Sequence, residues 1–243
     1  MARERPYSAL ARYYDRVYAS KDYAMETREI LRFARTAGGR PIRSVLDMAC
    51  GTGHHLAMLP PSITRAGVDR SPAMLRIARG RLERSASLFR GDMRTIRLHR
   101  AFDAVFCLFS AIGYLLTPRD RVAAFANFFR HLVPGGVAVV EGWIVPPEFR
   151  PNTVHLLTYN GDDAKIARVT TSSRVGTTSV MRMYYLAAEP GRPVRSFEEE
   201  HRMALVEPTD ILRSLERVGF HARARKSPSY PARRIFVAVR PGV

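Results

Sequence analysis

The stretch SVLDMACGTGHHL, residues 44–56, constrains the fold of this chain more than any other segment. Residues 44–50 form a short apolar and β-branched run, which is long enough for a buried parallel strand, and Gly51 and Gly53 end it. Residues 56–59 then begin a helical pattern. A strand, a glycine turn and a helix in this order are the first half of a nucleotide-binding β–α–β unit. We therefore expect a nucleotide-like ligand at this turn.

The sequence after the turn agrees with such a ligand, but not with the common dinucleotide fingerprint. That fingerprint, G-x-G-x-x-G, needs Gly or Ala where Leu56 stands. Asp69 follows a second apolar stretch about twenty residues beyond the turn, at the distance where a carboxylate can accept both hydroxyls of a ribose. Ser71 is predicted to cap a helix that begins at Pro72 and has Met74 on its apolar side. The ribose of the ligand is therefore expected beside Asp69.

The pattern D-x-A-x-G-x-G, formed by Asp47, Ala49, Gly51 and Gly53, resembles motif I of the class I S-adenosylmethionine-dependent methyltransferases. Later segments are similar to the same family. FRGDMR supplies an acid after a third strand, FDAVFCLFS a fourth strand, and HLVPGGVAVVE the turn into a fifth. The resemblance implies an α/β, Rossmann-like class I methyltransferase fold with a mostly parallel seven-stranded sheet. It also implies S-adenosyl-L-methionine as the cofactor and S-adenosyl-L-homocysteine as its product.

The alternation of strands and helices breaks between Asn152 and His201. Extended runs in this region are separated by NGDD and RVGTT, which are turn signals for antiparallel hairpins. We therefore expect a small antiparallel β insertion. We divide the chain into an N-terminal helical cap (1–30), a cofactor-binding core (31–150), an antiparallel β substrate platform (151–201), and a C-terminal helix and strand (202–243) that complete the core.

A closer resemblance covers nearly the whole chain, including segments outside the cofactor motifs. ARYYDRVYASKDY, CLFSAIGYL, LVPGGVAVVEGWIVPPEF, EEEHRMAL and the final RRIFVAV are similar, in this order, to the sugar N,N-dimethyltransferases that finish macrolide amino sugars of the desosamine and mycaminose type. The resemblance implies N,N-dimethylation of a dTDP-linked 3-amino-deoxyhexose in antibiotic biosynthesis. It also implies a homodimer.

The two resemblances imply roles for particular residues. Glu141 and Tyr114 are the candidate catalytic residues, since either can accept the proton of the amine directly or through water. The expected cofactor-binding residues are Tyr14, Asp47, Ala49, Gly51, Gly53, His55, Asp69, Met74, Asp92, Met93 and Cys107. The expected substrate-binding residues are Tyr7, Ser110, Trp143, Arg174 and Arg233, the last of them for a pyrophosphate. Ala111 and Tyr114 depart from the family pattern, so sugar contacts are expected to differ there. Arg234 replaces a glycine of the family, a change that either adds a phosphate contact or narrows the pocket.

No metal site is expected. His54 and His55 open the helix after the glycine turn, but they have no matched pair of Cys or carboxylate ligands in the sequence. We expect them to shape the methionine end of the cofactor site instead. His201, in EEEHRM, is expected to form a salt bridge at a strand edge rather than to act in catalysis.

The formal net charge of +17 raises the alternative of a nucleic-acid partner. The arginines are scattered from Arg3 to Arg240 without a block of five or six, and CLFS stands where base-modifying enzymes carry an NPPY- or DPPY-type tetrad. We therefore expect a small-molecule substrate and no nucleic acid. A methyltransferase for another small amine or hydroxyl stays open, and an RNA or DNA methyltransferase or a noncatalytic cofactor-binding module is a weaker alternative.

Neither a membrane segment nor a secretory signal is expected. The longest apolar stretches, such as Val137 to Val140, are far shorter than the roughly 20 residues that cross a bilayer. The N-terminal MARERPYSALARYY lacks the apolar part of a signal peptide. Cys50 and Cys107 lie in apolar runs, where buried and inert thiols are expected. The expected compartment is the cytoplasm.

Overall fold

The chain folds into two compact units. The structure is a computed structural model that describes residues 3–4, 7, 9–227 and 229–242. The smaller unit comprises Met1–Lys21 and Arg150–Met203, and the larger unit comprises Asp22–Phe149 and Ala204–Val243. The structure therefore divides residues 1–30, which we expected as one cap, between the two units. The division falls there because the helix that begins at Tyr23 packs on the sheet of the larger unit.

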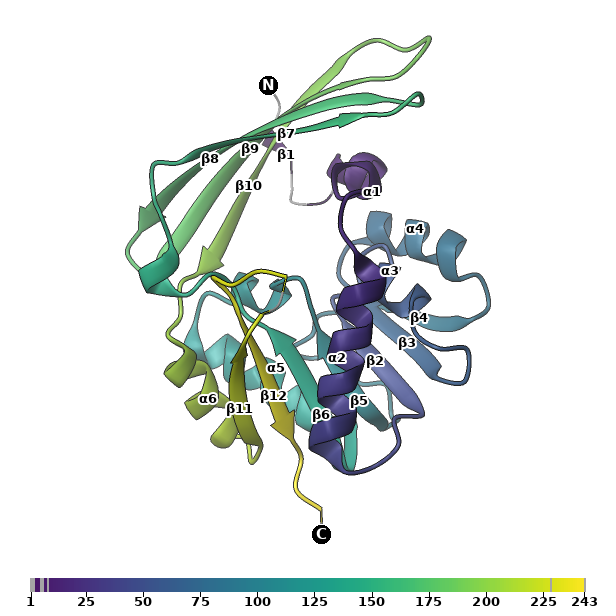
Figure 1. The fold of residues 1–243 in the computed structure, drawn as a ribbon, viewed down its shortest axis with the longest axis vertical. Coiled ribbons are helices and arrows are strands. Elements are labelled where there is room, and N and C mark those ends of the chain that lie inside the picture. Colours follow the sequence, from purple (N-terminus) through teal and green to yellow (C-terminus); the bar gives the residue numbers. More distant parts are fainter. Residues whose placement is uncertain (1–2, 5–6, 8, 228, 243) are drawn as a thin grey trace. The chain divides into compact units, whose positions relative to one another are not determined.

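The larger unit is built on a seven-stranded sheet with the strand order β11-β12-β6-β5-β2-β3-β4 (Figure 1). The strands are β2 (Ser44–Met48), β3 (Thr64–Asp69), β4 (Ala86–Arg90), β5 (Phe102–Cys107), β6 (Leu132–Glu141), β11 (His221–Lys226) and β12 (Arg234–Val239). Strands β2 to β6 pair in parallel, whereas β11 and β12 are antiparallel to their neighbours. The predicted mostly parallel, seven-stranded α/β sheet is confirmed. The chain order reverses between β3 and β5 on either side of β2, and open α/β sheets bind ligands at the carboxyl ends of the strands at such a point.

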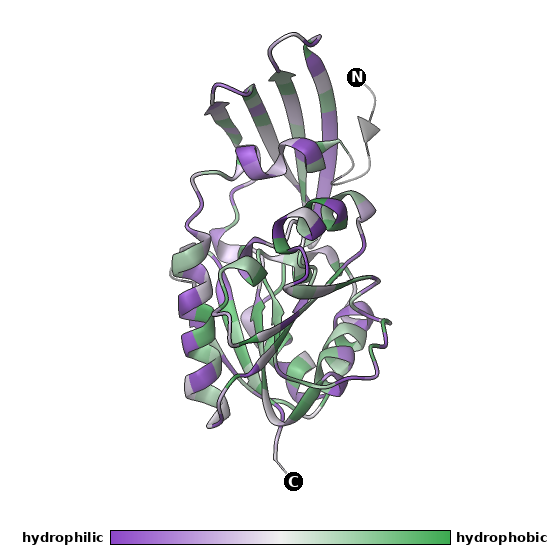
Figure 2. Cartoon of the chain, turned by 90° about the vertical axis from the view of Figure 1, so that its right-hand side faces the viewer, coloured by the Kyte–Doolittle hydropathy of each residue, from purple (hydrophilic) through white to green (hydrophobic). Residues whose placement is uncertain are grey.

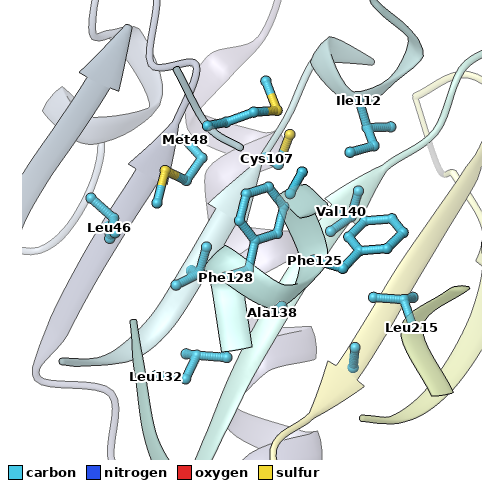
Figure 3. Packing of buried hydrophobic residues seen from close by; sticks show 14 of the residues in the cluster. Leu46, Met48, Cys107, Ile112, Phe125, Phe128, Leu132, Ala138, Val140 and Leu215 are labelled. Carbon is cyan, nitrogen blue, oxygen red and sulfur yellow. The ribbon is translucent and has the colours of Figure 1, made fainter. Parts of the chain in front are cut away.

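Helices cover both faces of this sheet, as Figure 1 shows. One group comprises α2 (Tyr23–Gly38), α3 (His54–Ala57) and α4 (Pro72–Leu82), and the other comprises α5 (Pro118–Arg130) and α6 (Pro208–Glu216). Alternate residues of each strand face opposite groups. In β5, Phe106 packs with the first group and Cys107 with the second. Figure 3 shows Phe125 and Phe128 of α5 packed on Cys107 and Val140 in the second core. The central strands β2 and β5 and the second half of β6 are buried on both faces, which explains why these segments are mostly apolar.

One helix, α4, begins where the sequence predicts. Ser71 caps α4, since its Oγ accepts a hydrogen bond from the amide N of Met74 at 3.3 Å, and Pro72 is the first helical residue. Asp22 caps α2 in the same way through the amide N of Met25, at 2.8 Å. In Figure 2 the helices of the larger unit carry alternating hydrophilic and hydrophobic segments, as expected for helices with one face on a core. These caps fix the first turn of each helix beside the carboxyl edge of the sheet.

The smaller unit contains a five-stranded sheet with the order β1-β10-β9-β8-β7. Its strands are β1 (Arg3–Glu4), β7 (Val154–Asn160), β8 (Lys165–Val175), β9 (Thr178–Ala188) and β10 (Arg195–Ala204). β7 and β8, and β8 and β9, pair antiparallel, with turns at the predicted NGDD and at Gly176. The predicted antiparallel insertion is confirmed.

The remaining elements are short. They are η1 (Leu10–Tyr13) and α1 (Tyr14–Val17) in the smaller unit, and η2 (Ala111–Tyr114) and η3 (Pro146–Glu148) in the larger unit. Across the part of the chain that the structure describes, no helix combines the length and the apolar character that a membrane span requires.

Candidate functional site

The glycine turn after β2 is held by a single carboxylate. Ala49, Gly51 and Gly53 have positive φ angles of 75°, 55° and 81°. Oδ2 of Asp69, the last residue of β3, accepts a hydrogen bond from the amide N of Gly51 at 2.8 Å, and Oδ1 accepts one from the amide N of Ser71 at 2.8 Å. A Cβ placed on Gly51 would meet no atom within 4 Å. The turn is thus fixed from one side and open on the other.

Asp47, on β2 next to the turn, is a buried acid. It is 2% exposed, and its Oδ1 has no hydrogen-bond partner among the described residues. Burial, followed by the charge of Asp69, raises the pKa of Asp47 to about 8. Burial also raises the pKa of Asp69, although the amides of Ser71 and Gly51 favour its charged form. Both carboxylates would therefore be stabilised by a positive charge near the turn.

Sulfur-containing side chains form part of the apolar surroundings of this edge. Met74, Met93 and Cys107 are 2%, 9% and 0% exposed. Burial raises the pKa of the Cys107 thiol, and it raises that of the Cys50 thiol well above its usual value. Both cysteines are free and buried, so the expectation of buried thiols is confirmed. Cofactor contacts of Met74, Met93 and Cys107 stay predictions.

Asp92 lies after β4 and is held by an arginine that the sequence analysis did not single out. Nε of Arg94 donates to Oδ1 of Asp92 at 3.0 Å, and Nη2 donates to Oδ2 at 2.8 Å. Nη1 of the same arginine donates to Asp120 at 2.6 Å. The hydrogen bonds from Arg94 lower the pKa of Asp92. Asp92 is therefore an ionised acceptor, the group that an exocyclic amine of a base requires.

Glu141 ends β6 and connects two distant segments. It is 6% exposed. Its Oε2 accepts a hydrogen bond from the amide N of Phe109 at 2.7 Å, and its Oε1 accepts one from Nη1 of Arg233 at 3.0 Å. Ser110 is fully buried, and its Oγ donates to the carbonyl O of Gly142 at 2.8 Å. The structure therefore brings together three predicted site residues, Ser110, Glu141 and Arg233.

Two further predicted residues lie in the same region of the larger unit. Trp143 follows β6 and lines a small apolar pocket, whose other lining residues include Ile112, Val145 and Phe236. Tyr114 is the last residue of η2 and is half-buried. The pocket lies beside the Glu141 segment, since Gly142 also lines it.

His55 is paired with a glutamate that sequence reasoning missed. Its Nε2 lies 3.1 Å from Oε2 of Glu26 on α2, and each side chain is 10% exposed. The ring of Tyr23 stacks on His54 at 4.2 Å between centroids and meets His55 edge-on at 5.1 Å. Glu26 also lines a second small pocket together with Glu141 and Ser227. Its only sequence signal is an acid in the first turn of an amphipathic helix.

Tyr7 and Tyr14, the predicted N-terminal site residues, belong to the smaller unit. Their ring centroids are 6.0 Å apart, and the ring of Tyr7 lies 5.3 Å from that of His201. Glu199, 1% exposed, accepts a hydrogen bond from the amide N of Tyr7 at 3.1 Å. Nε2 of His201 lies 3.2 Å from Oε2 of Glu199, which is the salt bridge expected in this strand when the imidazole is protonated. The tyrosines are thus attached to β10 through a buried carboxylate.

Arg174, the last predicted residue, lies on the surface of the smaller unit near the β8–β9 turn. It is exposed, and its Nε donates to the carbonyl O of Gly176 at 2.8 Å. No group of three metal-ligating side chains occurs in the residues for which the structure gives a position. The expectation of a metal-free site stays a prediction.

Residues 45–136, which contain the glycine turn, Asp69 and Asp92, match a family model described as a methyltransferase domain. A relative from Streptomyces venezuelae, a dTDP-3-amino-3,4,6-trideoxy-alpha-D-glucopyranose N,N-dimethyltransferase, is 41% identical over 195 residues. That match covers 79% of this chain and 81% of the relative. The likeness therefore extends well beyond the methyltransferase domain.

Solved structures agree with the sequence matches. The crystal structure of Streptomyces venezuelae DesVI superposes with a TM-score of 0.88 at 37% identity, covering 96% of this chain and 98% of that one. S-adenosylmethionine-bound CalS10, an amino pentose methyltransferase from Micromonospora echinaspora involved in calicheamicin biosynthesis, gives a TM-score of 0.83 at 29% identity. It covers 99% of this chain and 100% of that one.

The pKa of Asp47 predicts a specific pH dependence of stability. Between about pH 4 and pH 8 the folded chain keeps a proton on Asp47 that the unfolded chain has lost, so the free energy of unfolding should fall as pH rises through this interval. Asp47→Asn removes this contribution. The variant should gain stability relative to the parent by on the order of 1 kcal/mol per pH unit in this window. Denaturant unfolding of both proteins at pH 5, 6, 7 and 8 measures the difference, and a pH-independent difference would contradict the assignment.

Proposed function

Because the chain belongs to the family of dTDP-amino-sugar N,N-dimethyltransferases, we propose that it transfers two methyl groups in succession from S-adenosyl-L-methionine to the amino group of a dTDP-linked amino-deoxy sugar in antibiotic biosynthesis. The chain is an S-adenosylmethionine-dependent methyltransferase. One observation carries the proposal beyond that class: the strand ends place Asp69 and the glycine turn at the same edge of the sheet as Glu141. A cofactor site and a candidate amine site therefore share one edge.

The cofactor is proposed to lie along this edge with its adenosine over β3 and β4. Asp69 retains lone pairs for the ribose hydroxyls while it holds Gly51 and Ser71, since each carboxylate oxygen accepts two hydrogen bonds. Asp92 would accept the adenine amino group, with Met93 against the ring. The methionine end would be held beside Gly51, on the open side of the turn. The remaining proposed contacts are Ala49, Gly53, His55, Met74, Cys107 and Tyr14.

The chemistry proposed for the amine depends mainly on position. The sulfonium of the cofactor is already activated, so holding a neutral amine in line with the methyl group supplies most of the acceleration. The amine nitrogen uses its lone pair to form the new C–N bond, the C–S bond breaks, and its electron pair stays on sulfur. Glu141 and Tyr114 are the proposed groups for anchoring the amine or accepting its proton, directly or through water. Tyr7, Ser110, Trp143 and Arg174 are the proposed sugar contacts.

Arg233 is proposed to bind the two phosphate groups of the dTDP part. Arginine is suited to this role because its planar fork donates two hydrogen bonds at once. In the structure its guanidinium is paired with Glu141 and 12% of its side chain is exposed. Binding of a diphosphate therefore requires Arg233 to exchange one anionic partner for another. A second reading, methylation of a different small amine, requires no such exchange.

The ribose assignment can be tested through cofactor affinity. Asp69→Ala should weaken binding of S-adenosyl-L-methionine by about 1.5–3 kcal/mol, the range for hydrogen bonds to charged groups. Isothermal titration calorimetry gives the value. Asp163→Ala, at an exposed carboxylate of the smaller unit, serves as the control and should leave the affinity unchanged. Equal affinities for all three proteins would remove Asp69 from the cofactor site.

The substrate assignment can be tested through Arg233. Arg233→Ala should raise the KM for a dTDP-3-amino sugar at least about tenfold, since a charge-assisted contact is lost. Calorimetry should show nearly unchanged affinity for S-adenosyl-L-methionine. Arg213→Ala is the control, because the Arg213 side chain is 76% exposed and its guanidinium pairs with Asp210 on the surface of α6.

The opposite outcome would restrict the assignment to a methyltransferase of unknown substrate. That outcome is efficient methylation of free small amines, no activity on dTDP-amino sugars, and no effect of Arg233→Ala. A salt-sensitive affinity for RNA or DNA would instead favour the nucleic-acid alternative.

A homodimer, working in the cytoplasm, is part of the proposal. The open face of the smaller sheet carries exposed Val154, Leu156, Val169 and Leu186, which are 69%, 69%, 39% and 53% exposed. Leu156 pairs directly with Val169 across β7 and β8, so these side chains share one face. A contiguous apolar face is uncommon on a monomer and typical of a contact surface. A second copy of this chain is the proposed partner that covers this face. The cytoplasmic location is proposed separately, because free and buried thiols such as those of Cys50 and Cys107 are typical of a reducing compartment.

A charge within this face should separate the two copies. Leu156→Asp should convert a dimer into a monomer in sedimentation velocity, because it places a carboxylate in the apolar contact. Val194→Asp changes another exposed valine, 60% exposed, that lies between β9 and β10, and should leave the dimer intact. A parent protein that sediments as a monomer at micromolar concentration would refute the dimer.

A further inference from the structure

The guanidinium of Arg233 lies inside a cage of aromatic rings. Its Cζ is 4.1 Å from the ring centroid of Tyr230, 5.0 Å from that of Trp143 and 5.6 Å from that of Phe109. All three distances are within the range of cation–π attraction. One aromatic ring is enough to stack on an arginine side chain, but here three rings surround the guanidinium. The cage therefore has the composition of a cation-binding site.

A buried carboxylate closes the cage. Oε1 of Glu141 accepts the hydrogen bond from Arg233 at 3.0 Å, and the side chain of Glu141 is 7% exposed. The amide N of Phe109 fixes the other oxygen at 2.7 Å. Trp143 also lines the small apolar pocket beside the cage. A methylated ammonium is recognised by three features. These are a carboxylate that accepts its N–H, aromatic faces that stabilise its charge, and an apolar pocket that holds its alkyl groups.

We infer that Phe109, Trp143, Tyr230 and Glu141 form the binding site for the substrate nitrogen, and that Arg233 occupies this site until the substrate displaces it. The inference rests on the proposed function, because it identifies the part of that site that selects alkylated amines. It assigns a role to Phe109 and Tyr230, which the sequence motifs do not single out.

Displacement follows from electrostatics. Two cations cannot share the cage, since like charges about 4 Å apart in a poorly solvated site repel strongly. The entering amine takes over Glu141, and Arg233 moves to the phosphate groups that arrive on the same substrate. A free amine brings no anion for Arg233 and therefore competes poorly. The exchange thus selects substrates that carry a cationic nitrogen and an anionic group together.

The cage also explains how two methyl groups are added. Each transfer moves positive charge from sulfur to nitrogen, and the aromatic faces stabilise the charge that arrives. The monomethylated ammonium then loses a proton to water, and its neutral form attacks a second cofactor. An alkylated ammonium is less hydrated than a primary one, so the cage holds it more tightly. The monomethyl intermediate should therefore bind the enzyme at least as well as the primary amine does. It should be methylated again rather than accumulate.

The first test compares the two methylation steps. A dTDP-3-amino sugar is supplied with S-adenosyl-L-methionine, and monomethyl and dimethyl products are separated by mass spectrometry. In Trp143→Leu and Tyr230→Leu, kcat/KM for the second methylation relative to the first should fall about three- to thirtyfold, and monomethyl product should accumulate. Trp143→Phe and Tyr230→Phe keep an aromatic face and should restore dimethylation. Equal losses in both steps, without rescue by phenylalanine, would overturn the inference.

The second test does not depend on activity. Trp143 is the only tryptophan of the chain, so intrinsic fluorescence reports on the cage directly. Tetramethylammonium chloride, with sodium chloride at equal ionic strength as the control, is titrated into the parent protein and into Arg233→Ala and Arg233→Gln. Both variants should bind at least about tenfold more tightly than the parent, because the competing guanidinium is gone.

Equal responses in all three proteins, or none in the variants, would overturn the inference. If the parent fails to methylate any dTDP-amino sugar, the proposed function fails, whereas the fluorescence titration still decides whether the cage binds an alkylated cation.

Discussion

The carboxylate of Asp69 joins three segments on which the rest of the larger unit depends. It accepts hydrogen bonds from the amide N of Gly51 and the amide N of Ser71, both at 2.8 Å, from the end of β3. Without these bonds the glycine turn would keep the large conformational freedom that glycine has in an unfolded chain. The same carboxylate also fixes the residue that caps α4. One side chain therefore sets the relation between the turn after β2, the end of β3 and the start of α4.

Two acids with raised pKa values lie at this edge, although the chain as a whole carries a formal charge of +17. Asp47 and Asp69 lie close enough for each to matter to the other, and burial raises the pKa of both. The abundant arginines are absent from the contacts of Asp47 in the described part of the chain. A buried acid such as Asp47 is costly in a folded protein unless it stays protonated or a cation approaches it. The cofactor of this family carries a sulfonium. The two acids would therefore stabilise the cofactor-bound protein relative to the protein without cofactor.

The sequence predicted those features that depend on near neighbours. Apolar runs bounded by glycine marked β2, and Ser71 followed by Pro72 marked the start of α4, because caps and strand ends are local. β11 was not placed, since HARARK has the charged composition of an edge strand rather than an apolar pattern. The antiparallel insertion was found through its turns, whereas its assembly with residues 1–21 as one unit has no local signal.

The candidate site was predictable as a set of residues but not as a set of pairs. Glu26 and His55 are 29 residues apart, and Glu141 and Arg233 are 92 apart. Nothing in the spacing of either pair indicates contact, because the first pair depends on the packing of α2 against α3 and the second on the pairing of β6 with β12. The sequence thus named Glu141 and Arg233 for separate roles, one with the amine and one with the phosphates. In the proposed function, the hydrogen bond between Arg233 and Glu141 would couple these two roles through one buried carboxylate.

Backbone strain is concentrated at that carboxylate. Phe109 and Ser110 are consecutive residues with positive φ angles of 50° and 60°, a conformation that side chains other than glycine rarely adopt. Each such residue costs on the order of 1–3 kcal/mol and persists only where neighbouring contacts determine it. Glu141 holds the amide of Phe109 and the carbonyl of Gly142 accepts from Ser110, so β6 imposes the conformation of the loop after β5. A relaxed loop would release the ring of Phe109 from the guanidinium that it faces, and the strain is therefore part of how the aromatic cage is built.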